Sequence, residues 1–176
     1  MGTECRTDSS NMATGSFYFF GVLFSIIIWI KCTDICGRKP IVATGATLQL
    51  LGYTGAMLYP GGNWYMYSYY FLLGSGAVMS LCTSYNYLIE FTPNSSKIPI
   101  GTLYLALQML PALVLPIYLG IFSQNSLYFL YCGLGMTALG YLLLMTLPES
   151  PKYLYSVDRF FECEKALNKI AKINGV

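Results

Sequence analysis

Charged side chains are the residues of this chain best able to do polar chemistry, and they lie between long apolar stretches rather than inside them. The chain has no histidine, and its five apolar stretches contain no Asp, Glu, Lys or Arg. General acid–base catalysis and proton relays inside a membrane both need ionisable groups that face the interior. The sequence therefore predicts that the chain is not an enzyme, and it indicates no cofactor.

The cysteines do not form a convincing metal site. Cys32 and Cys36 are four residues apart, but a zinc site needs four N or S ligands. The chain offers no histidine and no second close pair of cysteines. We predict no metal site. We also predict no disulfide within the chain, because only Cys5 falls on the extracellular side of the arrangement described below.

Acidic and basic residues occur together at the ends of the apolar stretches. Opposite charges at neighbouring helix ends can pair into a network, although one exposed pair contributes only about 0 to 1 kcal/mol. Signals that orient the chain in a membrane would explain the basic residues equally well, but not the acidic residues beside them. We predict a network that favours one conformation, formed by Asp34, Arg38, Lys39, Glu90, Lys97, Glu149 and Lys152.

The elements that must position these charges are helices that cross a lipid bilayer. Of the 176 residues, 55% are apolar and only 10% are charged, which leaves too few polar side chains to cover a soluble core of that size. A bilayer core of about 30 Å needs about 20 helical residues. We predict an all-α membrane protein with five transmembrane helices at residues 13–30, 41–59, 66–89, 100–122 and 127–147.

The distribution of Lys and Arg fixes the orientation of these helices. Nine of the ten basic residues fall on one side of the membrane if each stretch crosses once, and basic loops face the cytoplasm. We predict a multi-pass protein of the plasma membrane, with an extracellular segment at residues 1–12, a bundle at 13–147 and a cytoplasmic tail with one helix at 148–176. A net charge of +2 without a basic patch excludes nucleic acid as a partner.

Two further features concern packing. Gly74 and Gly76 are small residues within the third stretch, where they would let helix backbones approach closely. Residues 159–173 of the tail have an apolar face that includes Phe160, Cys163 and Leu167. This predicted helix would dock on the bundle or lie along the inner leaflet, and we favour docking.

Four segments resemble, in order, landmarks of the major facilitator superfamily of transporters. Residues 34–39 (Asp-Ile-Cys-Gly-Arg-Lys) resemble the D-R-x-G-R-R/K loop between its second and third helices. Residues 71–76 are similar to its Gly-rich fourth helix, and residues 87–97 are similar to its E-x-x-P-x-x-x-R link. Residues 147–154 (Leu-Pro-Glu-Ser-Pro-Lys-Tyr-Leu) resemble the segment after the sixth helix in the sugar porters and organic ion transporters.

The resemblance implies that the five stretches correspond to the second to sixth helices of an incomplete major facilitator bundle. It also implies a cytoplasmic gate that includes Gly37 together with the seven charged residues named above. Ile35 replaces a usual Arg, and Lys97 and Lys152 stand where Arg is usual. Lys lacks the planar fork with which Arg pairs a carboxylate, so we expect a weaker gate than in typical members.

Two functions follow as hypotheses. The first is transport of small organic solutes (organic cations or anions, carnitine-like compounds or sugars) by alternating access, with this chain forming part of the N-terminal half. The segment at residues 15–21 and the ending at Asn174 favour the organic ion branch. The alternative is a truncated, non-transporting membrane protein that binds or regulates a full-length transporter. The expected partners are the bilayer, the solute and a second transporter half or full-length relative.

Overall fold

The computed structural model describes residues 8–58, 62–121 and 127–174, which form helices without any strand. The predicted all-α fold is therefore confirmed. Residues 1–7 of the predicted extracellular segment lie outside the described residues. The elements are α1 (Asp8–Cys36), α2 (Arg38–Leu58), α3 (Asn63–Phe91), the 3-10 turn η1 (Asn94–Ser96), α4 (Lys97–Ile121), α5 (Leu127–Thr146), α6 (Pro151–Ser156) and α7 (Phe160–Asn174).

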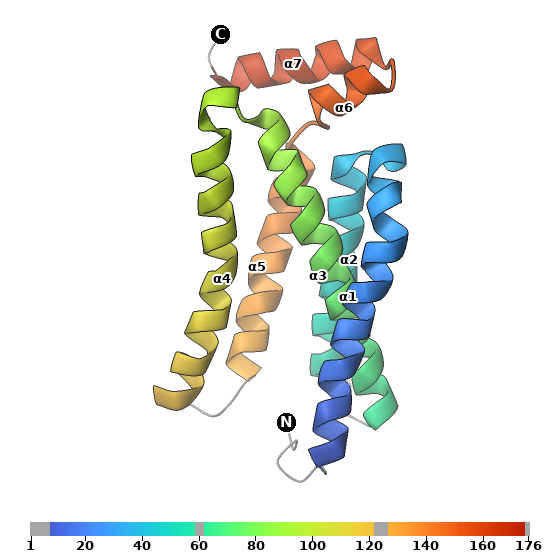
Figure 1. Ribbon diagram of the computed structural model, residues 1–176, viewed down its shortest axis with the longest axis vertical. Helices are drawn as coiled ribbons and strands as arrows, with labels where there is room; N and C mark the ends of the chain where they lie inside the picture. Colours follow the sequence, from blue (N-terminus) through green and yellow to red (C-terminus); the bar gives the residue numbers. More distant parts are fainter. Residues whose placement is uncertain (1–7, 59–61, 122–126, 175–176) are drawn as a thin grey trace.

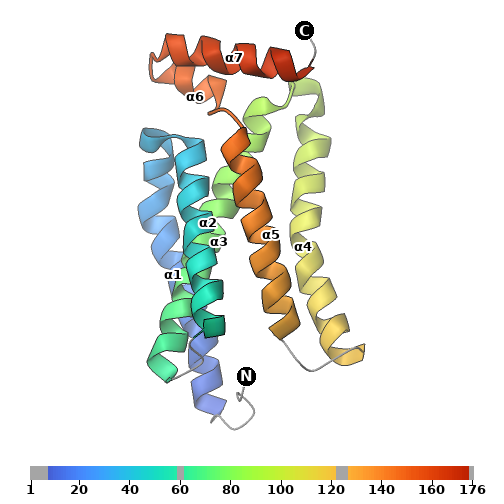
Figure 2. The same ribbon diagram turned by 180° about the vertical axis from the view of Figure 1, so that it is seen from behind.

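Five long helices run side by side, and the two short C-terminal helices lie across one end of them (Figure 1). The connection between α1 and α2 is at this same end, whereas the start of α1 is at the opposite end in both views (Figure 2). The predicted charged loops are therefore gathered at the end that carries α6 and α7.

Four of the five predicted spans are both long and apolar enough to cross a membrane, namely Met12–Trp29, Arg38–Leu58, Asn94–Ile121 and Leu127–Thr146. The remaining span lies within α3, whose 29 residues are long enough but include several Tyr, Ser and Asn residues that lower its hydropathy. Its position explains this composition, because α3 has eight buried residues and is shielded by its neighbours.

Helix α3 packs between α1 and α2, and glycine makes both contacts close. A Cβ atom on Gly74 would lie 2.1 Å from the carbonyl oxygen of Tyr18, and one on Gly76 would lie 2.5 Å from that of Gly45. On the facing side, a Cβ on Gly21 would lie 2.3 Å from the oxygen of Phe71. Each crossing thus brings backbone against backbone, the geometry that small residues permit in membrane helices.

Helices α4 and α5 are packed much less closely. Gly101 is the buried residue of α4, and Leu144 is the buried residue of α5. Helix α4 approaches α3 near the end that carries α6 and α7 and then diverges from it (Figure 1). The bundle is therefore compact on the side of α1, α2 and α3 and open on the side of α4.

The tail contains two helices rather than the one predicted. The additional helix is α6, which begins because Ser150 accepts a hydrogen bond from the backbone N–H of Tyr153 at 3.3 Å and Pro151 occupies the first helical turn. Its six residues are too few to show a period, so the sequence pattern did not reveal it.

The predicted tail helix is present as α7, and it docks mainly on α6. Cys163 and Ala166 are buried together with Tyr153 and Leu154. The Nζ atom of Lys169 donates a hydrogen bond to the carbonyl oxygen of Thr146 at 2.5 Å, which ties α7 to the end of α5. Phe160 and Leu167, which the sequence placed on the docking face, remain exposed, because α6 is too short to cover the whole face.

Candidate functional site

Arg38, the first residue of α2, lies at the centre of a cluster of charges. Its guanidinium group pairs with Oδ1 of Asp34 at 2.9 Å and with Oε1 of Glu90 at 3.2 Å. It also donates to the carbonyl oxygen of Thr33 at 2.8 Å and lies 5.4 Å from the ring centre of Tyr153. One side chain thereby joins the ends of α1 and α3 to the start of α2.

Glu149, which follows α5, binds the start of α2 through backbone atoms. Its carboxylate accepts hydrogen bonds from the N–H groups of Arg38 at 3.2 Å and of Lys39 at 3.1 Å, and from its own neighbour Ser150 at 3.0 Å. The first N–H groups of a helix have no partner within the helix, and its dipole favours a negative charge there. Glu149 therefore caps α2 from a distant part of the chain.

Lys39 makes the converse contact with the end of α5. Its Nζ atom donates to the carbonyl oxygens of Met145 at 3.2 Å and Leu147 at 2.6 Å, and a cation at a helix C-terminus is favourable. Glu149, after α5, therefore caps the start of α2, and Lys39, in α2, caps the end of α5. We call Asp34, Arg38, Lys39, Glu90 and Glu149 the charge cluster.

Two tyrosines reinforce the charge cluster. The hydroxyl of Tyr153 in α6 donates to the carbonyl oxygen of Ile35 at 2.7 Å, and the hydroxyl of Tyr87 in α3 donates to that of Pro148. The sequence pattern does not single out either tyrosine as a member of the site, because their partners are backbone atoms and no charge pattern marks them. The spacing of Tyr153, three residues after the helix-capping Ser150, is the one feature of the sequence that could have indicated its position.

Gly37 forms the turn between α1 and α2 at the centre of this cluster. Its φ angle is +100°, which residues with a side chain rarely adopt. A Cβ atom there would also lie 2.9 Å from Oε2 of Glu149 and 3.0 Å from the ring of Tyr153. Both the backbone conformation and the packing therefore require glycine.

The structure brings together six of the eight predicted gate residues: Asp34, Gly37, Arg38, Lys39, Glu90 and Glu149. Lys97 and Lys152 make no ion pair within the described part of the chain. Burial differs strongly between the members, since the side chains of Arg38 and Glu90 are 17% and 11% exposed and that of Asp34 is 76% exposed. The Arg38–Glu90 pair is therefore the one least screened by solvent.

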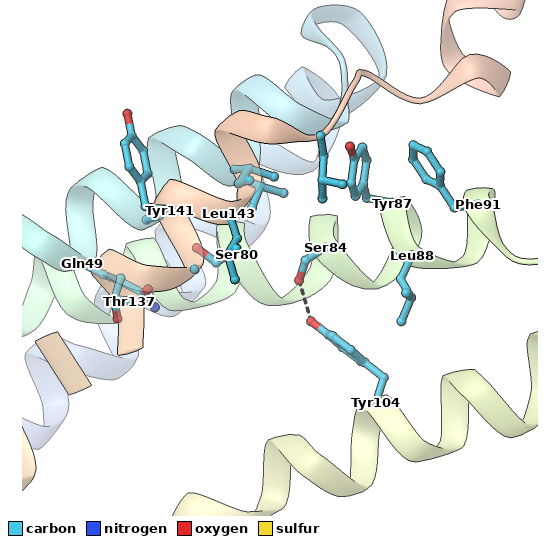
Figure 3. A pocket seen from close by; sticks show the side chains of 15 residues that line it. Gln49, Ser80, Ser84, Tyr87, Leu88, Phe91, Tyr104, Thr137, Tyr141 and Leu143 are labelled. Atoms are coloured by element: carbon cyan, nitrogen blue, oxygen red, sulfur yellow. Dashed lines mark hydrogen bonds between the residues drawn. The ribbon is translucent and has the colours of Figure 1, made fainter. Parts of the chain in front are cut away.

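A pocket of about 600 Å³ opens beside the charge cluster, between α2, α3 and α5 and facing Tyr104 of α4 (Figure 3). No charged residue lines it. The Tyr104 hydroxyl reaches Ser84 Oγ at 2.5 Å (Figure 3) and donates to the carbonyl oxygen of Leu81 at 3.2 Å. The lining of the pocket is mostly apolar, with a few polar side chains contributed by Gln49, Ser80, Ser84, Tyr87, Tyr104, Thr137 and Tyr141.

Known proteins match this chain along almost its whole length. The family described as sugar (and other) transporter matches residues 2–176. Solute carrier family 22 member 4 of Mus musculus is 27% identical over 98% of the chain and 31% of its own length. Organic cation/carnitine transporter 2 is 29% identical in Mus musculus and 28% in Homo sapiens, and each alignment covers 98% of the chain and 31% of the relative. The chain thus spans less than a third of the length of these relatives.

Proposed function

We propose a transport function on the premise that this chain belongs to the sugar (and other) transporter family, which matches residues 2–176. The chain would form part of the N-terminal half of a transporter that moves small organic solutes by alternating access. Its relatives include proteins named as organic cation/carnitine transporters. Organic cations and carnitine are therefore the first solutes to test.

The observation that carries this proposal is the reciprocal capping between α2 and α5. Alternating access requires one end of the bundle to close while the other opens. Glu149 and Lys39 join α5 to α2, and Arg38 joins α2 to α1 and α3. These contacts are short and geometrically specific, so they can stabilise one discrete arrangement of four helix ends. We propose that the charge cluster is the gate at one end of the solute path.

We further propose that this end faces the cytoplasm. Lys31, Lys97 and the basic residues of the tail lie at or near it, and basic segments are retained in the cytoplasm. Epitope tags test the orientation. A tag after Val176 is expected to bind antibody only after the cells are permeabilised, whereas a tag before Met1 is expected to bind on intact cells. The opposite pattern would refute the orientation.

The 600 Å³ pocket and the low burial of α4 and α5 favour packing against a helix beyond the five described. Only 6% of the residues in the apolar segments of α4 and α5 are buried, against 11% in α1 and 33% in α2. A helix in a bundle normally buries one face, but α4 buries only Gly101. The pocket beside Tyr104 is also apolar. We propose that another transmembrane helix fills it in the working transporter.

Uptake measurements test the gate. In proteoliposomes that contain a transporter carrying this segment, Glu149→Lys is expected to lower uptake of carnitine or an organic cation by about tenfold, the effect of about 1.4 kcal/mol on a conformational equilibrium. The amount of protein inserted should not change. Lys152→Glu is the matched control, because Lys152 has no ion pair in the described residues. Unchanged uptake by Glu149→Lys would refute the gate.

The open side of the bundle also favours the second function, a non-transporting chain that binds a full-length relative. The same vesicles distinguish the two. Vesicles with this chain alone that take up no solute, together with co-purification of the chain with a full-length transporter, would support the second function. Uptake by the chain alone would refute it.

A further inference from the structure

A second pocket, of about 160 Å³, lies between α1 and α3 and is separate from the pocket beside Tyr104. All of its lining residues come from these two helices, and none comes from α2, α4 or α5. Its character is different, because hydroxyl, amide and carboxylate side chains contribute much of its surface. The polar members of the lining are Ser25, Thr33, Asp34, Thr83 and Asn86.

The floor of this pocket holds a buried hydroxyl without a protein partner. Ser25 is 1% exposed, and its Oγ atom makes no hydrogen bond to any described residue. Thr83 is 3% exposed on the facing helix. A serine hydroxyl in a helix commonly bonds to the carbonyl of the preceding turn, as Ser16 does with Met12 at 3.1 Å. Because a buried polar group without a partner is costly, Ser25 indicates that another molecule completes its hydrogen bonds.

The rim of the pocket is polar as well. Asp34, Asn86 and Cys82 line it and are exposed. Asp34 also belongs to the charge cluster, so the pocket begins at the end of the bundle that carries α6 and α7. From Asp34 it extends nine residues back along α1 to Ser25, a distance of about 13 Å at 1.5 Å per helical residue.

We propose that this pocket is a water-filled crevice that admits water and small hydrogen-bonding molecules from the charged end of the bundle. One water needs at least about 10–15 Å³ of such space and two to four polar partners, so the pocket has room for several waters and the groups to hold them. The crevice would hydrate the contact between α1 and α3 within the membrane. It is a property of this chain whatever solute is transported, and Asp34 is the one residue that it shares with the proposed gate.

Two native cysteines provide the test. Cys82 and Cys132 are both exposed and both lie within long helices, but only Cys82 lines the polar pocket. A cysteine thiolate attacks the sulfur of a methanethiosulfonate, forms a disulfide with it and displaces a sulfinate. A charged reagent of this kind does not enter the apolar lipid core. A cysteine in the crevice should therefore react quickly with a charged, water-soluble methanethiosulfonate, whereas a cysteine facing lipid should not.

The experiment labels the unmodified chain in lipid vesicles with a trimethylammonium methanethiosulfonate and measures each cysteine by peptide mass spectrometry. Cys82 is expected to react at least about tenfold faster than Cys132, because the charged reagent reaches only thiols that are in contact with water. It should also react faster when the reagent is on the side of the tail. Equal rates at the two cysteines, whether both slow or both fast, would overturn the proposal.

A variant at the rim tests the route to Cys82. Asn86 lines the pocket one helical turn nearer the charged end than Cys82, so Asn86→Trp should slow the labelling of Cys82 severalfold, while Ser16→Trp, at an exposed position of α1, should not. Unchanged labelling in Asn86→Trp would contradict entry from the charged end. If Asn86→Trp fails to fold, the comparison of Cys82 with Cys132 in the unmodified chain still decides.

Discussion

The helices α1, α2 and α3 differ sharply from α4 and α5 in how they are held. In the first group, glycines bring backbone within contact of backbone, and α3 has eight buried residues. In the second group, a Cβ atom added to Gly120, Gly135 or Gly140 would meet nothing within 4 Å. Both groups contain glycine at similar frequency, so glycine content alone does not reveal which helices pack.

This difference shows which helices pack backbone against backbone. Helix α3 packs closely against both α1 and α2, and the charge cluster links the ends of all three helices. Helix α5 is attached at that same end through Lys39 and Glu149, and near its start Gly133 lies against Tyr53 of α2. Helix α4 contacts α3 through Tyr104 and at Gly101. The remaining faces of α4 and α5 are apolar and exposed, as are many side chains of α1.

The largest expected effect comes from enlarging a glycine in the compact group. Gly74→Leu forces a side chain into the backbone of α1 at Tyr18, so we expect a loss of folding at or above the upper end of the roughly 1–3 kcal/mol that overpacking usually costs. Gly135→Leu on α5 should fold normally. The yield of monodisperse protein in detergent measures both. Equal yields would erase the contrast between the two groups of helices.

The next effect concerns the attachment of α5. Glu149→Ala removes a carboxylate that binds several N–H groups at the start of α2, and we expect a loss of about 2–3 kcal/mol, typical of hydrogen bonds to a charged group. Glu162→Ala, at an exposed pair with Arg159, should change little. Thermal unfolding in detergent compares them. Should Glu149→Ala prove as stable as Glu162→Ala, the cap on α2 contributes nothing.

A smaller effect is expected from Arg38→Lys. Lys keeps the charge but lacks the fork that reaches Asp34 and Glu90 together, so we expect a loss of about 1–2 kcal/mol, part of what bonds to charged groups contribute. Arg159→Lys is the exposed control. The same unfolding measurement applies, and an unaltered midpoint for Arg38→Lys would mean that a single positive charge suffices there.

The smallest effect should be confined to α4. Tyr104→Phe removes the hydroxyl that bridges α4 to α3, worth about 1 kcal/mol, and should speed hydrogen exchange of amides in α4 without changing α3. Tyr128→Phe, at an exposed position of α5, serves as the control. Faster exchange in α1, α2 or α3 would show that the two groups of helices are coupled.

Much of the fold could be predicted from the sequence because lipid imposes simple rules. Uncharged stretches of about 20 residues must be helices, since every backbone group needs a partner inside the bilayer. The stretch in α3 is more polar than the other four, yet it still forms a 29-residue helix because its neighbours shield it. Length therefore predicted the helix where composition alone would have missed it.

The site could be predicted only in part. Charges of opposite sign marked Asp34, Arg38 and Glu90, and the structure pairs them. The sequence could not show that Glu149 and Lys39 bind backbone atoms instead of each other, because main-chain acceptors and donors leave no pattern in side chains. The pocket between α1 and α3 was also invisible, since its residues come from helices that are distant in sequence.

The caps on α2 and α5 have a consequence for mutational surveys. The backbone carbonyl groups of Met145 and Leu147 accept hydrogen bonds from the ammonium group of Lys39. Because these are backbone atoms, the bonds remain whatever side chains those two positions carry. A scan that replaces these two residues one by one would find them tolerant and would pass over the interface altogether. Only changes to the donor and to the acid, or a proline that deletes an amide, would reveal where the two helices are fastened.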